Sequence, residues 1–258
     1  MKKIIFIGKG GVGKTTILST LCRLLADEGH KVLVIDCDPS MNLAMSLGIP
    51  FSEILSLNEN KSQLQEKLYT YLEESGATHE NHDLSKALEA HMIEVSEGLN
   101  LLVMGTIPHG GSGCLCSPMA MVKMLVDRLS TDGDQEFIMV DSPAGVEILG
   151  RGLSLEFDLS LVITEPTPKS MDVARHSLTL ASELGIKKQI VVANKIESGE
   201  EYDEVTNYIG QSEFKLYTIG FDRTVVDADK RGILLLDYAP ESPAIKDISK
   251  IKDSLLEV

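Results

Sequence analysis

Nine residues near the amino terminus have the types and spacing of a phosphate-binding loop. Their order fits the P-loop pattern G-x-x-x-x-G-K-[ST], in which a strand leads through a glycine-rich turn into a helix. Glycines let backbone N–H groups turn toward a phosphate, the lysine adds positive charge, and the threonine hydroxyl reaches a Mg²⁺ ion that bridges the phosphates. The sequence therefore predicts a nucleotide site. Its residues are Gly8, Lys9, Gly10, Gly11, Val12, Gly13, Lys14, Thr15 and Thr16.

The lysine directly after the first glycine is a more specific feature. An ordinary P-loop does not require Lys9, and a solvated loop lysine is the plain alternative. The stretch GKGGVGKTT nevertheless resembles the deviant P-loop of the MinD/ParA/iron-protein class of dimeric ATPases. This resemblance implies that the chain binds ATP and ADP, hydrolyses ATP and works as a homodimer. It also implies that Lys14 is catalytic and that Lys9 acts on the nucleotide of the partner subunit.

Aspartates follow two of the apolar runs that predict strands. Asp36 and Asp38 follow the run 32–35, and Asp141 follows the run 135–140. Ligands of open α/β sheets bind at the carboxyl ends of strands. In the resembled class Asp38 orients the attacking water, and Asp141 has the Walker B position, where a carboxylate holds a water of the Mg²⁺ shell. Asp36 supports either the Mg²⁺ site or the loop shape, and a helix cap is the alternative for one of the first pair.

An Asn-Lys pair ends another apolar run. Asn194 follows residues 189–193, which predict a strand. In the resembled class the asparagine of such a pair reads the edge of the adenine base. We therefore predict that Asn194 binds the nucleotide, with a helix-capping asparagine as the alternative.

Two cysteines lie one residue apart in a glycine-rich turn before a helix start at Pro118. Cys114 and Cys116 can both face one metal ion, and a nearby helix N-terminus favours the thiolate form that binds metal. Two ligands do not complete a coordination sphere, but two copies of the pair across a dimer axis supply four sulfurs for Ni²⁺ or Zn²⁺. Buried thiols or a redox pair are the alternatives. Cys22, on an apolar helix face, is predicted to be a core residue.

The elements that must position these residues alternate between strands and helices. This order predicts an α/β P-loop NTPase fold with a mostly parallel central sheet flanked by helices on both faces. Residues 1–258 are predicted to form a single domain, with a helical insertion at about 50–98. Further strands are predicted at 4–7, 99–104, 157–164 and 214–219, and helices at 14–28, 119–129, 147–155, 170–184, 200–209 and 243–256.

Charge and composition narrow the function classes. The formal net charge is -15 at pH 7 and the isoelectric point is near 4.8, which argues against a broad basic surface for nucleic acid or anionic lipid. No apolar run approaches the ~20 residues that span a membrane, and the first apolar run is too short for a signal peptide. Four cysteines do not resemble a secreted disulfide framework. We therefore predict a cytoplasmic protein without nucleic-acid or membrane partners.

The motifs together resemble the CooC family, the accessory ATPases of nickel-containing carbon monoxide dehydrogenase. The resemblance covers nearly the whole chain and depends mainly on the turn with Cys114 and Cys116; Ser142-Pro143 and the length of the insertion depart from the family. It implies a homodimer that depends on ATP, metal or both, one Ni²⁺ or Zn²⁺ between the subunits, and ATP hydrolysis coupled to nickel insertion into carbon monoxide dehydrogenase. Two alternatives are a MinD/ParA-type ATPase for spatial organisation and an iron-protein-like ATP-dependent reductase.

Overall fold

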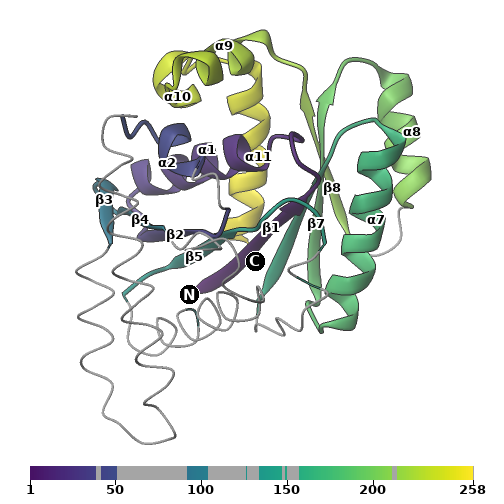
Figure 1. Cartoon of the computed structure of the whole chain (residues 1–258), viewed down its shortest axis with the longest axis horizontal. Helices are drawn as coiled ribbons and strands as arrows, with labels where there is room; N and C mark the ends of the chain where they lie inside the picture. The colour runs from purple at the N-terminus through teal and green to yellow at the C-terminus, as the bar shows by residue number, and fades with distance from the viewer. Residues whose placement is uncertain are drawn as a thin grey trace, which may run out of the picture.

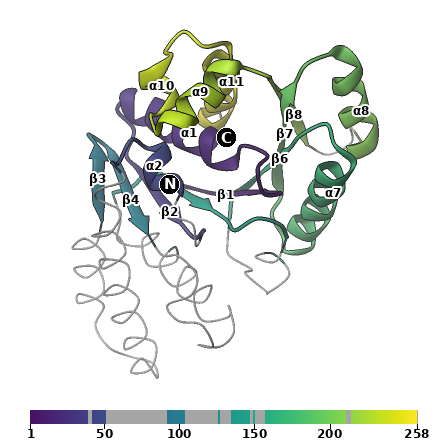
Figure 2. The ribbon, with the colours of Figure 1, turned by 45° about the horizontal axis from the view of Figure 1, so that its top comes forward.

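One mixed sheet forms the centre of the molecule (Figures 1 and 2). The computed structural model describes residues 1–38, 42–50, 92–103, 126, 134–146, 149, 157–210 and 214–257. Within these residues the strand order is β3-β4-β2-β5-β1-β6-β7-β8, and every neighbouring pair is parallel except β3 with β4. The strands are β1 Lys2–Gly8, β2 Val32–Asp36, β3 Ile93–Ser96, β4 Leu99–Val103, β5 Phe137–Asp141, β6 Leu159–Thr164, β7 Lys188–Ile196 and β8 Lys215–Gly220.

Helices cover both faces of the sheet, as predicted. The described helices are α1 Lys14–Asp27, α2 Asn42–Ser46, α7 Pro168–Glu183, α8 Gly199–Ile209, α9 Arg223–Arg231, α10 Leu235–Tyr238 and α11 Pro243–Leu256. Helices α1 and α11 pack together over one face, where α2, α9 and α10 also lie, whereas α7 and α8 cover the other face near β6 and β7 (Figure 1). No helix in the described part of the chain is long and apolar enough to cross a membrane.

The central strands are apolar on both sides because both sides are covered. In β1, Ile4 and Phe6 join the core cluster beneath α1 and α11, whereas Ile5 and Ile7 join the cluster beneath α7. Successive strand residues point to opposite faces, so a continuous apolar run is what a doubly covered parallel strand requires. The runs that predicted strands in the sequence have this character, and the α/β prediction is confirmed.

The segment before β4 differs from the prediction at its end. The helical insertion was predicted to extend to about residue 98, but Ile93–Ser96 form β3, an edge strand antiparallel to β4. Its two apolar side chains, Ile93 and Val95, alternate with polar ones, which is the period of a strand. Four residues are too few for that period to stand out beside a polar, helix-like segment. Residues 51–91 lie outside the described part of the chain.

The strand order brings the carboxyl ends of several strands together. The chain enters at β1 in the middle of the sheet, reaches β2 on one side, and returns through β5 before continuing to β6 on the other side. Strand β1 therefore has β5 and β6 as neighbours, and β2 lies next to β5. The loops after β1, β2, β5, β6 and β7 meet at one edge, and this edge carries the P-loop, the predicted aspartates and Asn194.

Candidate active site

The P-loop leads from the end of β1 into α1. Gly11 and Gly13 adopt left-handed backbone conformations, with φ of 81° and 96°, and Gly13 is the N-cap of α1. A Cβ atom on Gly13 would lie 2.4 Å from the Asn194 amide nitrogen, so this position excludes side chains for steric as well as conformational reasons. The first N–H groups of α1 and the positive end of its dipole lie at this loop and favour an anion there.

A cavity of about 620 Å³ opens over the start of α1. It gathers Lys14 and both threonines of the P-loop together with residues from β7 and from the loops after β2, β5 and β8. Lys9 is half-buried and does not line the cavity. The side chains of Val12, Asp36 and Asp141 are buried and also do not line it. The lining includes Gly10, Gly11, Gly13, Lys14, Thr15, Thr16, Asp38, Ala144, Asn194, Lys195, Gly220, Phe221 and Asp222.

Two buried aspartates lie side by side below the cavity. Asp36 and Asp141 are register partners at the ends of β2 and β5. The Thr15 hydroxyl donates to Asp141 Oδ2 at 3.0 Å, and the Asp38 N–H donates to Asp36 Oδ1 at 2.9 Å. The other oxygens, Asp36 Oδ2 and Asp141 Oδ1, are buried and have no hydrogen-bond partner among the residues that the structure describes. Such orphaned carboxylate oxygens indicate that a ligand completes the site.

The electrostatics of this pair favour a cation. Burial, together with the charge of Asp141, raises the pKa of Asp36 well above its usual value. Burial also raises the pKa of Asp141 to about 6, although Lys14 and the Thr15 hydrogen bond oppose the shift. Hard divalent cations prefer carboxylate and hydroxyl oxygens. Thr15, Asp36 and Asp141 therefore fit Mg²⁺, which would neutralise charge on a bound triphosphate.

Replacing Asp141 by asparagine is expected to stabilise the metal-free protein. The native pKa lies above the unfolded value of 3.8, so the native state binds this proton more tightly. The stabilisation of the native state by this bound proton is present below about pH 4 and disappears as the pH rises through about 6. At pH 7.5, Asp141→Asn should raise the free energy of unfolding by about 1–3 kcal/mol, and most of that gain should vanish at pH 4.

Urea unfolding in the presence of a chelator measures this effect. The exposed residue Asp203 provides the matched control, because Asp203→Asn removes the same charge from an exposed position of helix α8. A gain for Asp141→Asn that stays the same from pH 4 to pH 8 would contradict the electrostatic explanation.

The loop after β5 lies directly against the P-loop. The Gly145 N–H donates to the Gly8 carbonyl at 3.0 Å, and the Ala144 side chain approaches Gly10. The segment that begins with Asp141 therefore bridges the Walker B strand and the phosphate-binding loop. A change at a phosphate bound by the P-loop would therefore act directly on this segment.

Comparison with known proteins agrees with this geometry. Residues 3–236 match the family model CbiA, described as the CobQ/CobB/MinD/ParA nucleotide binding domain. The chain belongs to this family. It is a P-loop ATPase.

The relatives of this ATPase have several assigned roles. It is 35% identical to the carbon monoxide dehydrogenase accessory protein CooC of Rhodospirillum rubrum, over 92% of this chain and 90% of the relative. It is 34% identical to an uncharacterised ATP-binding protein of Methanocaldococcus jannaschii, over 99% and 98%. Among solved structures, the septum site-determining protein MinD of Pyrococcus horikoshii, complexed with Mg-ADP, superposes with a TM-score of 0.69 at 20% identity, covering 98% and 95%. That likeness confirms the fold.

The ATPase brings most of its predicted site residues together. Lys14, Thr15, Asp38 and Asn194 meet at one cavity. The Asn194 amide donates to the Val12 carbonyl, and adenine recognition by this residue stays a prediction. Cys114 and Cys116 lie outside the described residues.

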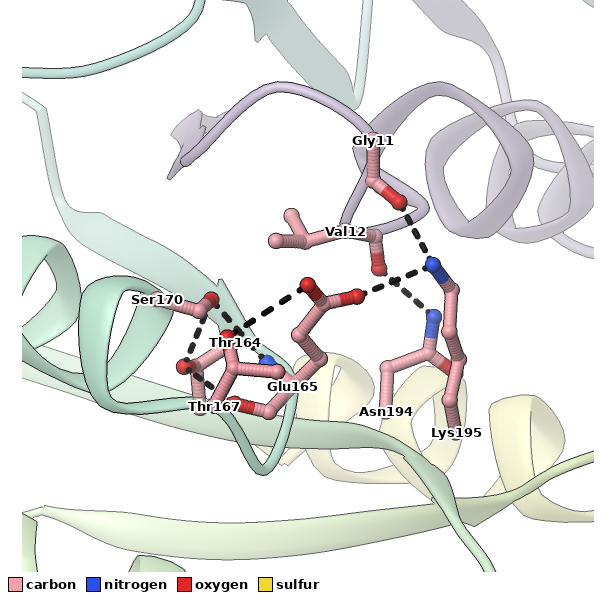
Figure 3. Close-up of polar contacts among 8 residues, drawn as sticks. All are labelled: Gly11, Val12, Thr164, Glu165, Thr167, Ser170, Asn194 and Lys195. Carbon is pink, nitrogen blue, oxygen red and sulfur yellow. Dashed lines mark hydrogen bonds and ion pairs between the residues drawn. The ribbon is translucent and has the colours of Figure 1, made fainter.

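Sequence reasoning missed two residues beside the P-loop of this ATPase, Lys195 and Glu165. The Lys195 ammonium contacts the Gly11 carbonyl, and Glu165 pairs with that ammonium (Figure 3). Their signals in the sequence were the Asn-Lys dipeptide at the end of one strand run and the Glu-Pro dipeptide at the end of another.

Proposed function

We propose that this ATPase is a dimeric maturation factor that binds nickel between its subunits and uses ATP hydrolysis to assist nickel insertion into carbon monoxide dehydrogenase. The observation that carries the proposal is the pairing of Cys114 and Cys116 within an ATPase that is 35% identical to a carbon monoxide dehydrogenase accessory protein. Nickel is then the cargo, and Zn²⁺ can bind the same thiolates.

The other two cysteines are poor metal ligands. Cys22 and Cys37 are free thiols that are fully buried, with exposed fractions of 0% and 1%. Burial raises the pKa of both thiols, and nearby carboxylates raise it further, so both stay protonated at neutral pH. A metal site needs the thiolate form. This chemistry leaves Cys114 and Cys116 as the sulfur ligands of the proposed site.

The positions of the candidate catalytic residues support the roles that we propose for them. Lys14 is buried at the start of α1, where its ammonium can offset the charge of a bound triphosphate. Asp38 lines the cavity and would orient the attacking water. Lys9 lies outside this lining, which suits a residue that reaches the nucleotide of a second subunit. Proteins of the MinD/ParA family dimerise.

A packing contact supports coupling between hydrolysis and the cysteine turn. Val126 is helical and fully buried, and it belongs to the core cluster that contains Ile138 and Val140 of β5. Strand β5 ends at Asp141, and the predicted helix 119–129 follows the cysteine turn. We therefore expect a shift of the Walker B strand to reach that turn through this contact.

Metal analysis of anaerobically purified protein, with and without ATP, tests the proposal. We expect nickel or zinc at about one ion per two chains, with the metal-bound form running as a dimer in size-exclusion chromatography. About four irons with sulfide per dimer would instead favour the reductase alternative. A dimer that binds ATP but takes up no metal under any condition would refute nickel delivery and favour the MinD/ParA-type organiser.

A further inference from the structure

Two consecutive side chains of β7 bind the backbone of the P-loop (Figure 3). Asn194 Nδ2 donates to the Val12 carbonyl at 2.7 Å, and Lys195 Nζ donates to the Gly11 carbonyl at 2.6 Å. These two carbonyls are also consecutive. One dipeptide therefore binds the backbone of the loop at two adjacent points.

The backbone at Lys195 makes this double contact possible. Successive side chains of a regular strand point to opposite faces, so Asn194 and Lys195 would not reach one target. Lys195 instead has φ of 62°, the single positive φ among non-glycine residues in the described part of the chain, and the register with β8 shifts at this point. A left-handed conformation is costly for a lysine and persists only where surrounding contacts impose it. The strain points to a role for the side chain.

Glu165 fixes the other side of the lysine. Its Oε2 lies 3.0 Å from Lys195 Nζ, and the two side chains are 18% and 41% exposed, respectively. The Glu165 N–H donates to the Ser170 hydroxyl at 3.1 Å, and the Thr164 hydroxyl donates to the same oxygen at 3.0 Å. Ser170 and Thr164 are buried, so Glu165 is held at a rigid junction between β6 and α7.

We propose that Lys195 is a positioning residue for the P-loop, and that Glu165 holds its ammonium in place. The lysine contact fixes the orientation of the Gly11 carbonyl, which leaves the N–H groups of the loop to face the phosphates. The inference rests on the ATPase activity and is independent of nickel delivery, because ADP binding alone reports on it.

Direct contact between the ammonium and a phosphate is the competing explanation, since Lys195 also lines the cavity. The Glu165→Gln variant distinguishes the two explanations, because they predict opposite changes in ADP affinity. If Lys195 binds phosphate directly, removal of a negative charge near an anion site should tighten ADP binding. If Lys195 positions the loop, loss of its anchor should weaken ADP binding.

Calorimetric titration with Mg-ADP tests the proposal. We expect Lys195→Ala to raise the Kd by about tenfold and Glu165→Gln by about threefold, because each removes a charge-assisted contact. The double variant should bind Mg-ADP no more weakly than Lys195→Ala alone, since both changes disrupt the same Glu165–Lys195 pair. Lys195→Arg should recover most of the affinity.

An exposed lysine before β7 provides the control. Lys187→Ala removes the same charge without touching the P-loop and should leave the Kd unchanged. Thermal unfolding verifies that each variant is folded, and Glu165→Gln with Lys195→Arg keeps the test valid if Lys195→Ala does not fold. Unchanged affinity in Lys195→Ala, or tighter ADP binding in Glu165→Gln, would overturn the proposal.

Discussion

Mixing the Lys9→Ala and Lys14→Ala variants is expected to restore ATP hydrolysis that neither variant shows alone. Lys14→Ala removes the ammonium that faces the phosphates within its own chain, which should lower turnover at least about 10²-fold. Lys9→Ala removes the charge that we propose Lys9 supplies to the partner's nucleotide, with an expected loss of about 10³-fold, comparable to a residue donated in trans to a phosphoryl-transfer site. Both losses exceed those expected from any other single substitution considered for this chain.

Complementation is expected because, in the proposed dimer, the two lysines serve different nucleotide sites. In a mixed dimer, the subunit with Lys9→Ala keeps its own Lys14 and receives Lys9 from its partner, so one complete site remains. Random exchange at equal concentrations makes half of the dimers mixed, which predicts about a quarter of the wild-type rate. The position of Lys9 outside the lining of its own cavity agrees with this arrangement, whereas Lys14 lies within that lining.

Phosphate release after mixing measures the effect. Lys14→Ala mixed with a Lys9→Ala/Lys14→Ala double variant is the matched control, because no dimer in that mixture has a complete site. If Lys9 acts within its own chain, the first mixture also stays inactive, and the proposed exchange of lysines between subunits is wrong.

Local sequence motifs predicted the P-loop better than they predicted the short helices around it. The P-loop is contiguous, so a strand, a glycine turn and a helix start can be identified without knowing the rest of the fold. Helix α1 accordingly begins at Lys14, and α11 spans Pro243–Leu256 as its spacing predicts. Helices α2 and α10 were missed because five and four residues carry too little periodicity. Helix α9 was also missed, because its sequence is mostly polar and it buries only Ala228.

Contacts between distant segments were the part that the sequence could not provide. Asp36 and Asp141 become neighbours because β2 pairs with β5, and nothing in either strand specifies that partner. The role of Asp36 was therefore open, whereas the structure places it beside Asp141 with a buried oxygen that no described residue hydrogen-bonds. The left-handed conformation of Lys195 was equally hidden, because a lysine after an asparagine gives no sign of a shift in strand register.

Replacing Cys114 and Cys116 together by serine is expected to abolish nickel and zinc binding while leaving nucleotide binding intact. A serine hydroxyl does not provide the thiolate that these metals require, and a symmetric site would lose all four sulfurs at once. We expect metal affinity to fall more than about 100-fold, because the loss concerns ligands rather than their supporting contacts. The Kd for Mg-ADP should change by less than about twofold, since the P-loop contacts remain.

Metal titration and ADP titration on the same preparation distinguish loss of the metal site from loss of the fold. Cys22→Ala is the matched control, because Cys22 lies on the buried face of α1 and contacts the Met139 sulfur of β5. Its thiol is protonated, so this variant should lose some stability but keep its metal. If the double serine variant retains nickel at wild-type affinity, the metal site lies elsewhere. The proposed coupling through Val126 and β5 would then not lead to a metal site, although the proposal for the ATPase site would be unaffected.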